Sequence, residues 1–191
     1  MLPSREEAER ILMEAEQCNP GAWAGHSRVA AKCAYRIAKR CRGLNPEKAY
    51  ICGLLHDIGR RFGICQMRHI YTGYRYMTDL GYDEVARICL SHSFHLKRLN
   101  EYVGDVDIEP QQLAELEQAL RAMEFDDYDR LIQLCDSLAM AEGVVTMEER
   151  MLDVKRRYGS YPQDKWDANF RLRSYFEEKM GRDLYAVVKS A

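Results

Sequence analysis

Apolar residues recur along most of the chain at the spacing of an α-helix. Between residues 24 and 41, for example, Val29, Cys33, Ile37 and Cys41 stand four positions apart and therefore share one helical face. Capping residues, prolines and glycines divide this pattern into separate segments. The pattern predicts helices over about residues 4–17, 24–41, 46–58, 68–80, 82–92, 110–123, 127–142, 146–158, 162–180 and 182–189.

The segments between these helices indicate the fold class and its organisation. No segment alternates apolar and polar residues over a sustained stretch, so we expect little or no β-sheet. Residues 59–66 and 100–109 are expected to be loops, and a turn with glycine and proline at 159–162 precedes a charged, aromatic last segment. The sequence thus predicts an all-α fold, with a compact helical bundle over residues 1–158 and a C-terminal helical extension over residues 159–191.

The composition is that of an ordinary globular protein. The 191 residues are 47% hydrophobic and 30% charged, and their net charge of −2 argues against a general nucleic-acid binder. No apolar run approaches the roughly 20 residues that span a bilayer, and the charged first residues do not resemble a signal peptide. Seven cysteines without a CxxC pair argue against a disulfide framework and a zinc knuckle. We therefore expect a cytoplasmic protein that does not bind membranes.

The segment that carries the most chemistry is residues 54–59, where His56 and Asp57 are adjacent at the predicted end of an apolar helix. His26 begins the preceding helix, and the short turn between the two helices should make them antiparallel, which brings His26 beside the pair. Asp136 lies among apolar residues, where a carboxylate is costly to bury unless it is paired or bound to a metal. Two simpler explanations stay open: a hydrogen-bonded His–Asp pair, and an exposed Asp136 on an amphipathic helix.

His26, His56, Asp57 and Asp136 together resemble the motif of the HD-domain superfamily of metal-dependent phosphohydrolases, in which a His is followed by His-Asp and a distal Asp. The resemblance extends over about residues 25–143. It implies an all-α HD-domain bundle in which these four side chains hold a metal ion in a cleft between helices.

Two more histidines extend the resemblance. His69 and His92 lie between the His-Asp pair and the distal Asp, as in the branch that hydrolyses diadenosine tetraphosphate and binds a second metal bridged by the aspartate. The chain departs from that branch at Arg60, where a lysine is common, and at residues 93–95, which replace Thr-Thr-Gly. The resemblance implies that His69 and His92 are ligands, while a surface position or a phosphate contact stays open for both.

The ligand types leave the metal open. Imidazole and carboxylate suit iron, manganese, nickel, zinc or magnesium, and either one or two ions. A divalent ion lowers the pKa of bound water, and two ions can stabilise both the attacking and the departing oxygen of a phosphoryl transfer. Phosphoryl oxygens also need cationic partners. We expect Arg60 and Arg61 to act in catalysis together with Asp57, and we expect these two arginines to contact substrate along with His95, Lys97 and Arg98.

These observations predict a metal-dependent phosphohydrolase that acts through a metal-activated water on a nucleotide or a related phosphoester or phosphoanhydride. The chain has no GxxxxGK[ST], GxGxxG or GxSxG motif, which disfavours a P-loop NTPase, a dinucleotide-binding domain and a serine hydrolase. Two alternatives stay open: a non-catalytic HD module that binds or senses nucleotides, and a di-iron HD oxygenase. The expected partner is a small molecule, and the charged last helices leave a homodimer open.

Overall fold

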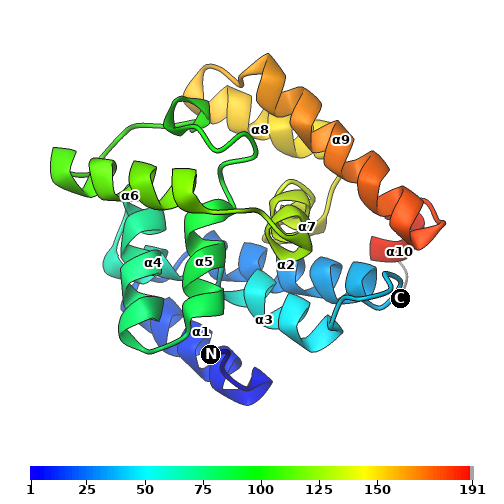
Figure 1. Ribbon diagram of the computed structural model, residues 1–191, viewed down its shortest axis with the longest axis horizontal. Coiled ribbons are helices and arrows are strands. Elements are labelled where there is room, and N and C mark those ends of the chain that lie inside the picture. Colours follow the sequence, from blue (N-terminus) through cyan, green and yellow to red (C-terminus); the bar gives the residue numbers. More distant parts are fainter. Residues whose placement is uncertain (190–191) are drawn as a thin grey trace.

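Helices form almost all of the regular structure in the computed structural model, which describes residues 1–189 (Figure 1). The elements in chain order are α1 (Arg5–Cys18), α2 (Ala22–Ala38), α3 (Pro46–Leu55), the 3-10 helix η1 (Ile58–Phe62), α4 (Arg68–Asp79), α5 (Asp83–Ser91), the 3-10 helix η2 (Leu99–Glu101), α6 (Pro110–Ala122), α7 (Asp127–Asp136), β1 (Ala139–Met140), β2 (Gly143–Val144), α8 (Met147–Tyr158), α9 (Gln163–Met180) and α10 (Leu184–Val188). The predicted all-α fold is confirmed.

Several helices begin at the capping residues that the sequence indicates. Ser4 Oγ accepts the amide N–H of Glu7 at 3.1 Å at the start of α1. Asn45 Oδ1 accepts an amide at the start of α3, where proline follows the cap. Thr146 and Glu149 exchange hydrogen bonds at the start of α8. These side chains satisfy amide groups that the first helical turn leaves without backbone partners.

The segment after Asp136 differs from the prediction, which continued the helix to residue 142. Ser137 Oγ instead donates to the carbonyl of Leu134 at 2.7 Å, and the chain turns into the short antiparallel β1–β2 hairpin. His26 Nδ1 donates to the buried carbonyl of Ala139 at 3.0 Å, an interaction that a continuing helix would disfavour by using that oxygen. The helical prediction for residues 137–142 was therefore wrong, and the hairpin supports a candidate site residue.

The helices pack around three connected groups of buried apolar side chains. In Figure 1, α2 and α3 run side by side and α7 lies against them. Helices α8 and α9 lie on the side of α7 that faces away from α2 and α3. Ile37 of α2, Leu134 of α7, Phe176 of α9 and Leu184 of α10 belong to one buried cluster. The last two helices thus share a core with the rest of the chain. The division at residue 158 stays a prediction, and residues 190–191 lie outside the described residues.

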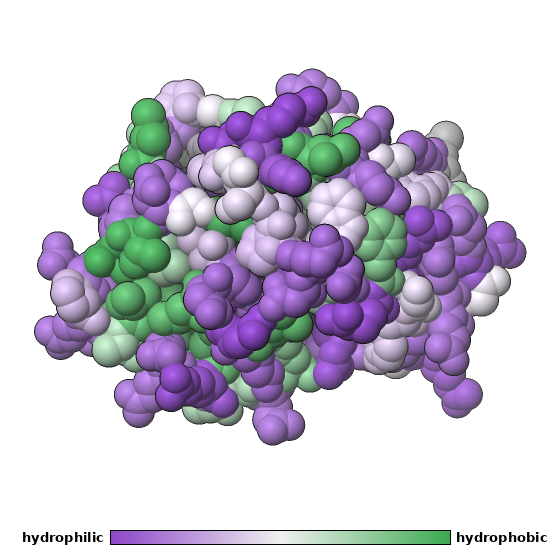
Figure 2. All heavy atoms as spheres, turned by 90° about the horizontal axis from the view of Figure 1, so that it is seen from above, coloured by the Kyte–Doolittle hydropathy of each residue, from purple (hydrophilic) through white to green (hydrophobic). Residues whose placement is uncertain are grey.

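The surface facing the viewer in Figure 2 is mostly hydrophilic, with apolar side chains in scattered patches. The exposed large apolar side chains include Phe62 and Ile64, which lie in and just after η1. Within residues 1–189, none of the helices combines the length and apolar character that crossing a bilayer requires.

Gly59 allows η1 to lie directly against α4, the helix that carries His69. A Cβ atom at this position would lie 1.9 Å from the carbonyl oxygen of His69 and 2.6 Å from the amide nitrogen of Gly73. Both are backbone atoms, so no side chain can rotate to make room. The glycine therefore sets the close approach of two segments that carry candidate ligands.

We expect Gly59→Ala to lower the free energy of unfolding by roughly 2–3 kcal/mol, because the added methyl group forces η1 away from α4. Urea unfolding of the metal-free protein measures this effect. Gly21→Ala is the matched control, since its Cβ would meet only the Trp23 side chain, 3.2 Å away at the nearest atom. Equal stability of the two variants would contradict the expectation.

Candidate metal centre

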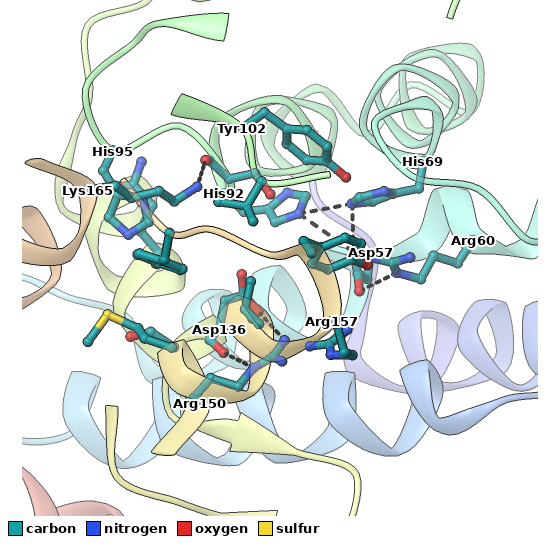
Figure 3. Close-up of a pocket in the computed structure, with 18 residues that line it drawn as sticks. Asp57, Arg60, His69, His92, His95, Tyr102, Asp136, Arg150, Arg157 and Lys165 are labelled. Atoms are coloured by element: carbon teal, nitrogen blue, oxygen red, sulfur yellow. Dashed lines mark hydrogen bonds and ion pairs between the residues drawn. The ribbon is translucent and has the colours of Figure 1, made fainter. Parts of the chain in front are cut away.

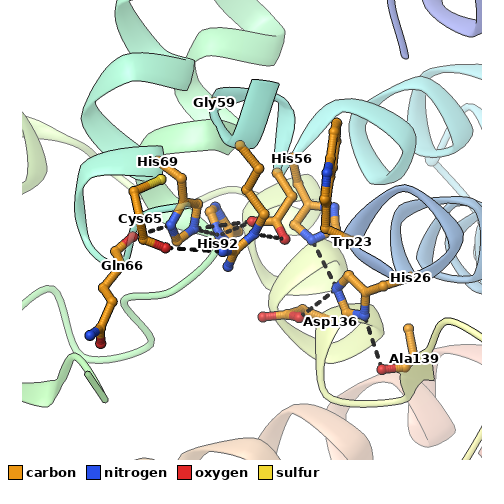
Figure 4. Close-up of polar contacts among 12 residues, drawn as sticks. Trp23, His26, His56, Gly59, Cys65, Gln66, His69, His92, Asp136 and Ala139 are labelled. Carbon is orange, nitrogen blue, oxygen red and sulfur yellow. Dashed lines mark hydrogen bonds and ion pairs between the residues drawn. The ribbon is translucent and has the colours of Figure 1, made fainter. Parts of the chain in front are cut away.

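The antiparallel pair α2 and α3 brings the first three candidate residues together. His26 lies near the start of α2, and His56 and Asp57 directly follow α3. His26 Nε2 lies 3.2 Å from His56 Nε2 and 3.0 Å from Asp136 Oδ1 (Figure 4). The last of these residues, Asp136, ends α7. Four residues that are distant in sequence thus meet in space, as the motif predicts.

The second pair of histidines approaches the same aspartate from the other side. His69 lies in the first turn of α4 and His92 caps the end of α5. The Nε2 atoms of His69 and His92 lie 3.1 and 3.6 Å from Asp57 Oδ1, and 3.4 Å from each other. Two triads result, His26–His56–Asp57 and Asp57–His69–His92, and within each triad the ligand atoms lie within 4.8 Å of one another. Asp57 belongs to both.

The four histidine rings are oriented in the same way. Each directs Nδ1 toward a backbone carbonyl oxygen, namely that of Ala139 for His26, Gly53 for His56, Gln66 for His69 and Cys89 for His92. In a neutral ring this bond places the proton on Nδ1 and leaves Nε2 as a lone pair. The lone pairs of His26 and His56 then face each other, as do those of His69 and His92. Two such lone pairs repel unless a cation lies between them, so this set of donors fits divalent metal ions.

Burial and charge favour the protonation states that a metal ion requires. Burial lowers the pKa of His56, and it lowers the pKa of His92 to about 3, so both rings are neutral near pH 7. Burial alone would raise the pKa of Asp57, but Arg60 and His69 outweigh it and hold this pKa well below its ordinary value. Burial would likewise raise the pKa of Asp136, but His26 and Arg150 outweigh it and hold this pKa well below its ordinary value. The site thus combines neutral imidazoles at His56 and His92 with ionised carboxylates at Asp57 and Asp136.

A cavity opens onto both triads (Figure 3). Its volume is about 710 Å³, part of which is open solvent at its mouth. Asp57, His69, His92 and Asp136 line one part of it. A small ligand that enters the cavity can therefore reach the candidate metal ligands.

Four cationic side chains also line the cavity. Arg60 Nε donates to Asp57 Oδ2 at 2.7 Å, and Arg150 lies 3.7 Å from Asp136 Oδ1. Arg157 and Lys165 complete the set, from α8 and α9. Asp57 and Asp136 therefore each have an arginine beside them.

Sequence reasoning identified Arg60 but missed Arg150, Arg157 and Lys165. One signal was present for Lys165, because it shares a face of α9 with Asn169 and Phe176 at spacings of four and seven. Phe176 is fully buried, and polar residues in register with it indicate a buried polar site. Nothing in the local sequence distinguishes Arg150 or Arg157 from the other charges of α8.

The structure separates the remaining predicted substrate contacts. His95 lines the cavity. Arg61 instead stacks over the ring of Tyr76, with its guanidinium carbon 4.3 Å from the ring centre. Lys97 and Arg98 also lie outside the cavity. Lys97 donates to the carbonyl of Met123, and Arg98 pairs with Asp164. The roles assigned to these side chains stay predictions.

The shared aspartate leads to an expectation about metal content. We expect His26→Ala and His69→Ala each to remove one bound ion, because each loses a ligand of one triad only. Asp57→Ala should remove both, since it takes a ligand from each triad. Inductively coupled plasma mass spectrometry of protein purified without chelator measures the ratio of metal to protein. A ratio in Asp57→Ala equal to that of the wild type would contradict the arrangement.

The buried histidines also predict the pH dependence of stability in the chelated protein. Burial lowers the pKa of both His92 and His95 to about 3, whereas histidine in an unfolded chain titrates near pH 6.5. Below that pH the unfolded chain binds protons that the folded chain does not, so acidification favours unfolding. We expect each ring to cost up to about 2 kcal/mol between pH 7 and pH 5. Urea unfolding at pH 7, 6 and 5 tests this.

His95→Gln is the control for the pH series, because glutamine does not titrate. It should show a shallower loss of stability than the wild type over the same range. Constant or rising stability of the wild-type protein between pH 7 and pH 5 would show that these histidines are not neutral and buried in the folded state.

Comparison with known protein families agrees with this geometry. Residues 23–141 match the HD domain, and the matched range contains the five residues of the two triads as well as Asp136. No curated protein and no solved structure matches the chain. HD domains are typically metal-dependent phosphohydrolases that bind divalent metal ions. Because the match covers more than half of the sequence, the chain belongs to the HD-domain family.

Proposed function

We propose that this protein is a metal-dependent phosphohydrolase that acts on a nucleotide or a related phosphoester or phosphoanhydride. The observation that carries the proposal is the pair of histidine-rich triads that share Asp57 at the wall of a cationic cavity. His26, His56, Asp57 and Asp136 would hold one ion, and His69 and His92 would hold a second together with Asp57. The predicted ligand set is thus proposed in full.

The chain's own residues account for binding and orientation. Divalent ions bound at these triads would supply an acidified water and positive charge for phosphoryl oxygens. Arg60 and Arg150 lie beside Asp57 and Asp136, where each guanidinium can bind oxygens of the same phosphoryl group. The backbone carbonyls that accept from the histidine Nδ1 atoms keep each ring in its ligand orientation. Asp57 keeps the two triads together.

The substrate class follows from the lining of the cavity. Tyr102, Tyr158 and Tyr161 line it and offer aromatic faces to a base or sugar. The predicted nucleotide or phosphoester partner is consistent with this lining, while the homodimer stays a prediction.

The finer proposal is a relation to the branch that hydrolyses diadenosine tetraphosphate. The position of His69 and His92 on Asp57 supports it. A second hollow, lined by Trp23, shares Asp57 and Arg60 with the main cavity, so a substrate with two arms could extend in both directions. Arg60 retains the positive charge of the lysine that is common in that branch.

The proposal is tested by hydrolysis of a panel of nucleoside phosphates and dinucleoside polyphosphates by protein purified without chelator. We expect His56→Ala and Asp57→Ala to lose metal and at least about 100-fold in kcat/KM, because loss of residues that merely support metal ligands already costs 10–100-fold. Asp79→Ala, an exposed aspartate at the end of α4, is the matched control and should retain both properties.

Other outcomes separate the alternatives. Retention of metal and activity in both His56→Ala and Asp57→Ala would rule out this site as the catalytic centre. Tight nucleotide binding without turnover by the metal-loaded wild type would favour a binding or sensing module. Oxygen consumption with a mixed-valence iron signal would favour a di-iron oxygenase.

A further inference from the structure

One of the four cations that line the cavity differs from the others in its partners. Arg60 pairs with Asp57, Arg150 lies within ion-pair distance of Asp136 and Asp153, and Arg157 pairs with Asp153. The fourth cation, Lys165, has no carboxylate oxygen within 4 Å among residues 1–189. Lys165 is also deeply buried, with an exposed fraction of 6%. A buried charge normally has a counter-charge, so this ammonium group indicates that an anion belongs beside it.

The contacts of Lys165 hold it in place without neutralising it. Its Nζ donates to the carbonyl oxygens of Ser93 at 2.7 Å and Glu101 at 3.4 Å. An ammonium group has three N–H donors, so one is left for a ligand. Burial lowers the pKa of Lys165, while Glu101, Asp136 and Asp164 oppose this effect from beyond ion-pair distance. The ammonium thus bears a desolvation cost that no close carboxylate repays.

Glu101, the strongest of these opposing charges, does not occupy the ligand position. Its Oε1 accepts the amide N–H groups of Leu96 and Arg98, and Glu101 is not part of the cavity lining. The carboxylate therefore stabilises the loop after α5 rather than the open side of Lys165.

The surroundings of Lys165 form a fixed end wall of the cavity. Asn169 Nδ2 donates to the carbonyl of Lys165 at 3.0 Å and to Tyr161 Oη at 3.1 Å, while Asn169 Oδ1 lies 3.1 Å from His95 Nε2. Figure 3 shows Lys165 and His95 at one end of the cavity and Asp57 with Arg60 at the other. Lys165 and Asp57 therefore lie at opposite ends of the space that a substrate would fill.

We propose that Lys165 binds a second anionic group of the substrate, a phosphate or a carboxylate, at the end of the cavity opposite Asp57. The inference rests on the proposed function, because it assumes that the phosphoryl group to be hydrolysed lies at the triads. It narrows the substrate class to phosphoesters or phosphoanhydrides that carry another negative charge. The matched HD segment ends at residue 141, so this selectivity comes from α9, outside it.

The test uses non-hydrolysable ligands and the full chain loaded with Mn²⁺. Isothermal titration calorimetry compares α,ω-alkylene bisphosphonates of one to six carbons with alkylphosphonates of the same length, which lack the second anion. Phosphonocarboxylates of the same lengths form a third set and identify the preferred second group. We expect at least one doubly anionic ligand to bind wild-type protein tenfold or more tightly than its singly anionic counterpart.

Three variants locate this advantage. Lys165→Met retains an unbranched chain without charge and should abolish the advantage, while alkylphosphonate binding stays within about twofold as evidence of an intact fold. Lys165→Arg retains the charge and should keep most of the advantage. Lys179→Met, on the same helix but paired with Asp127 outside the cavity, should leave it unchanged.

The outcomes separate this inference from the proposed function. If wild-type protein binds doubly and singly anionic ligands equally tightly, the role of Lys165 is overturned. The role is also overturned if Lys165→Met still binds the doubly anionic ligand more tightly. Failure of the proposed function would appear differently, as alkylphosphonate binding that does not depend on Mn²⁺ or as no hydrolysis of the nucleotide panel.

Discussion

The candidate centre depends on one carboxylate that serves two histidine pairs. Asp57 Oδ1 lies within 3.6 Å of Nε2 atoms that come from α4 and α5, and the same residue completes a triad with His26 and His56. The histidines can face it with lone pairs because their other nitrogens donate to backbone carbonyls. The accepting carbonyls lie near helix ends or, for Ala139, in the short β1–β2 hairpin.

Much of the fold, and the meeting of His26 with His56, could be predicted from sequence because the controlling interactions are local. Asp136, His69 and His92 joined the predicted ligand set through the resemblance to the HD-domain superfamily. Ser4, Asn45 and Thr146 cap helices within a few residues of themselves, so their patterns are visible in a short segment. The meeting of His26 with His56 follows from a single short connection between two consecutive helices. Such predictions need no knowledge of distant parts of the chain.

The features that the sequence did not indicate, namely the hairpin after Asp136 and the cavity residues of α8 and α9, depend on tertiary contacts. Residues 137–142 were expected to be helical, but a contact between the Ala139 carbonyl and His26 of a distant helix favours the hairpin. Arg150 and Lys165 line the cavity only because α8 and α9 fold back over the matched HD segment. No local pattern encodes that return. The cavity side chains that come from α8 and α9 are therefore harder to find from sequence than the residues of the motif.

The positions of the ligands at helix ends have a mechanical consequence. An ion held by His26, His56 and Asp136 would join α2, α3 and α7, while one held by His69 and His92 would add α4 and α5. Release of either ion would remove this link between the helices. Metal binding would therefore stabilise the helical bundle, and the free energy of unfolding would rise with the free metal concentration.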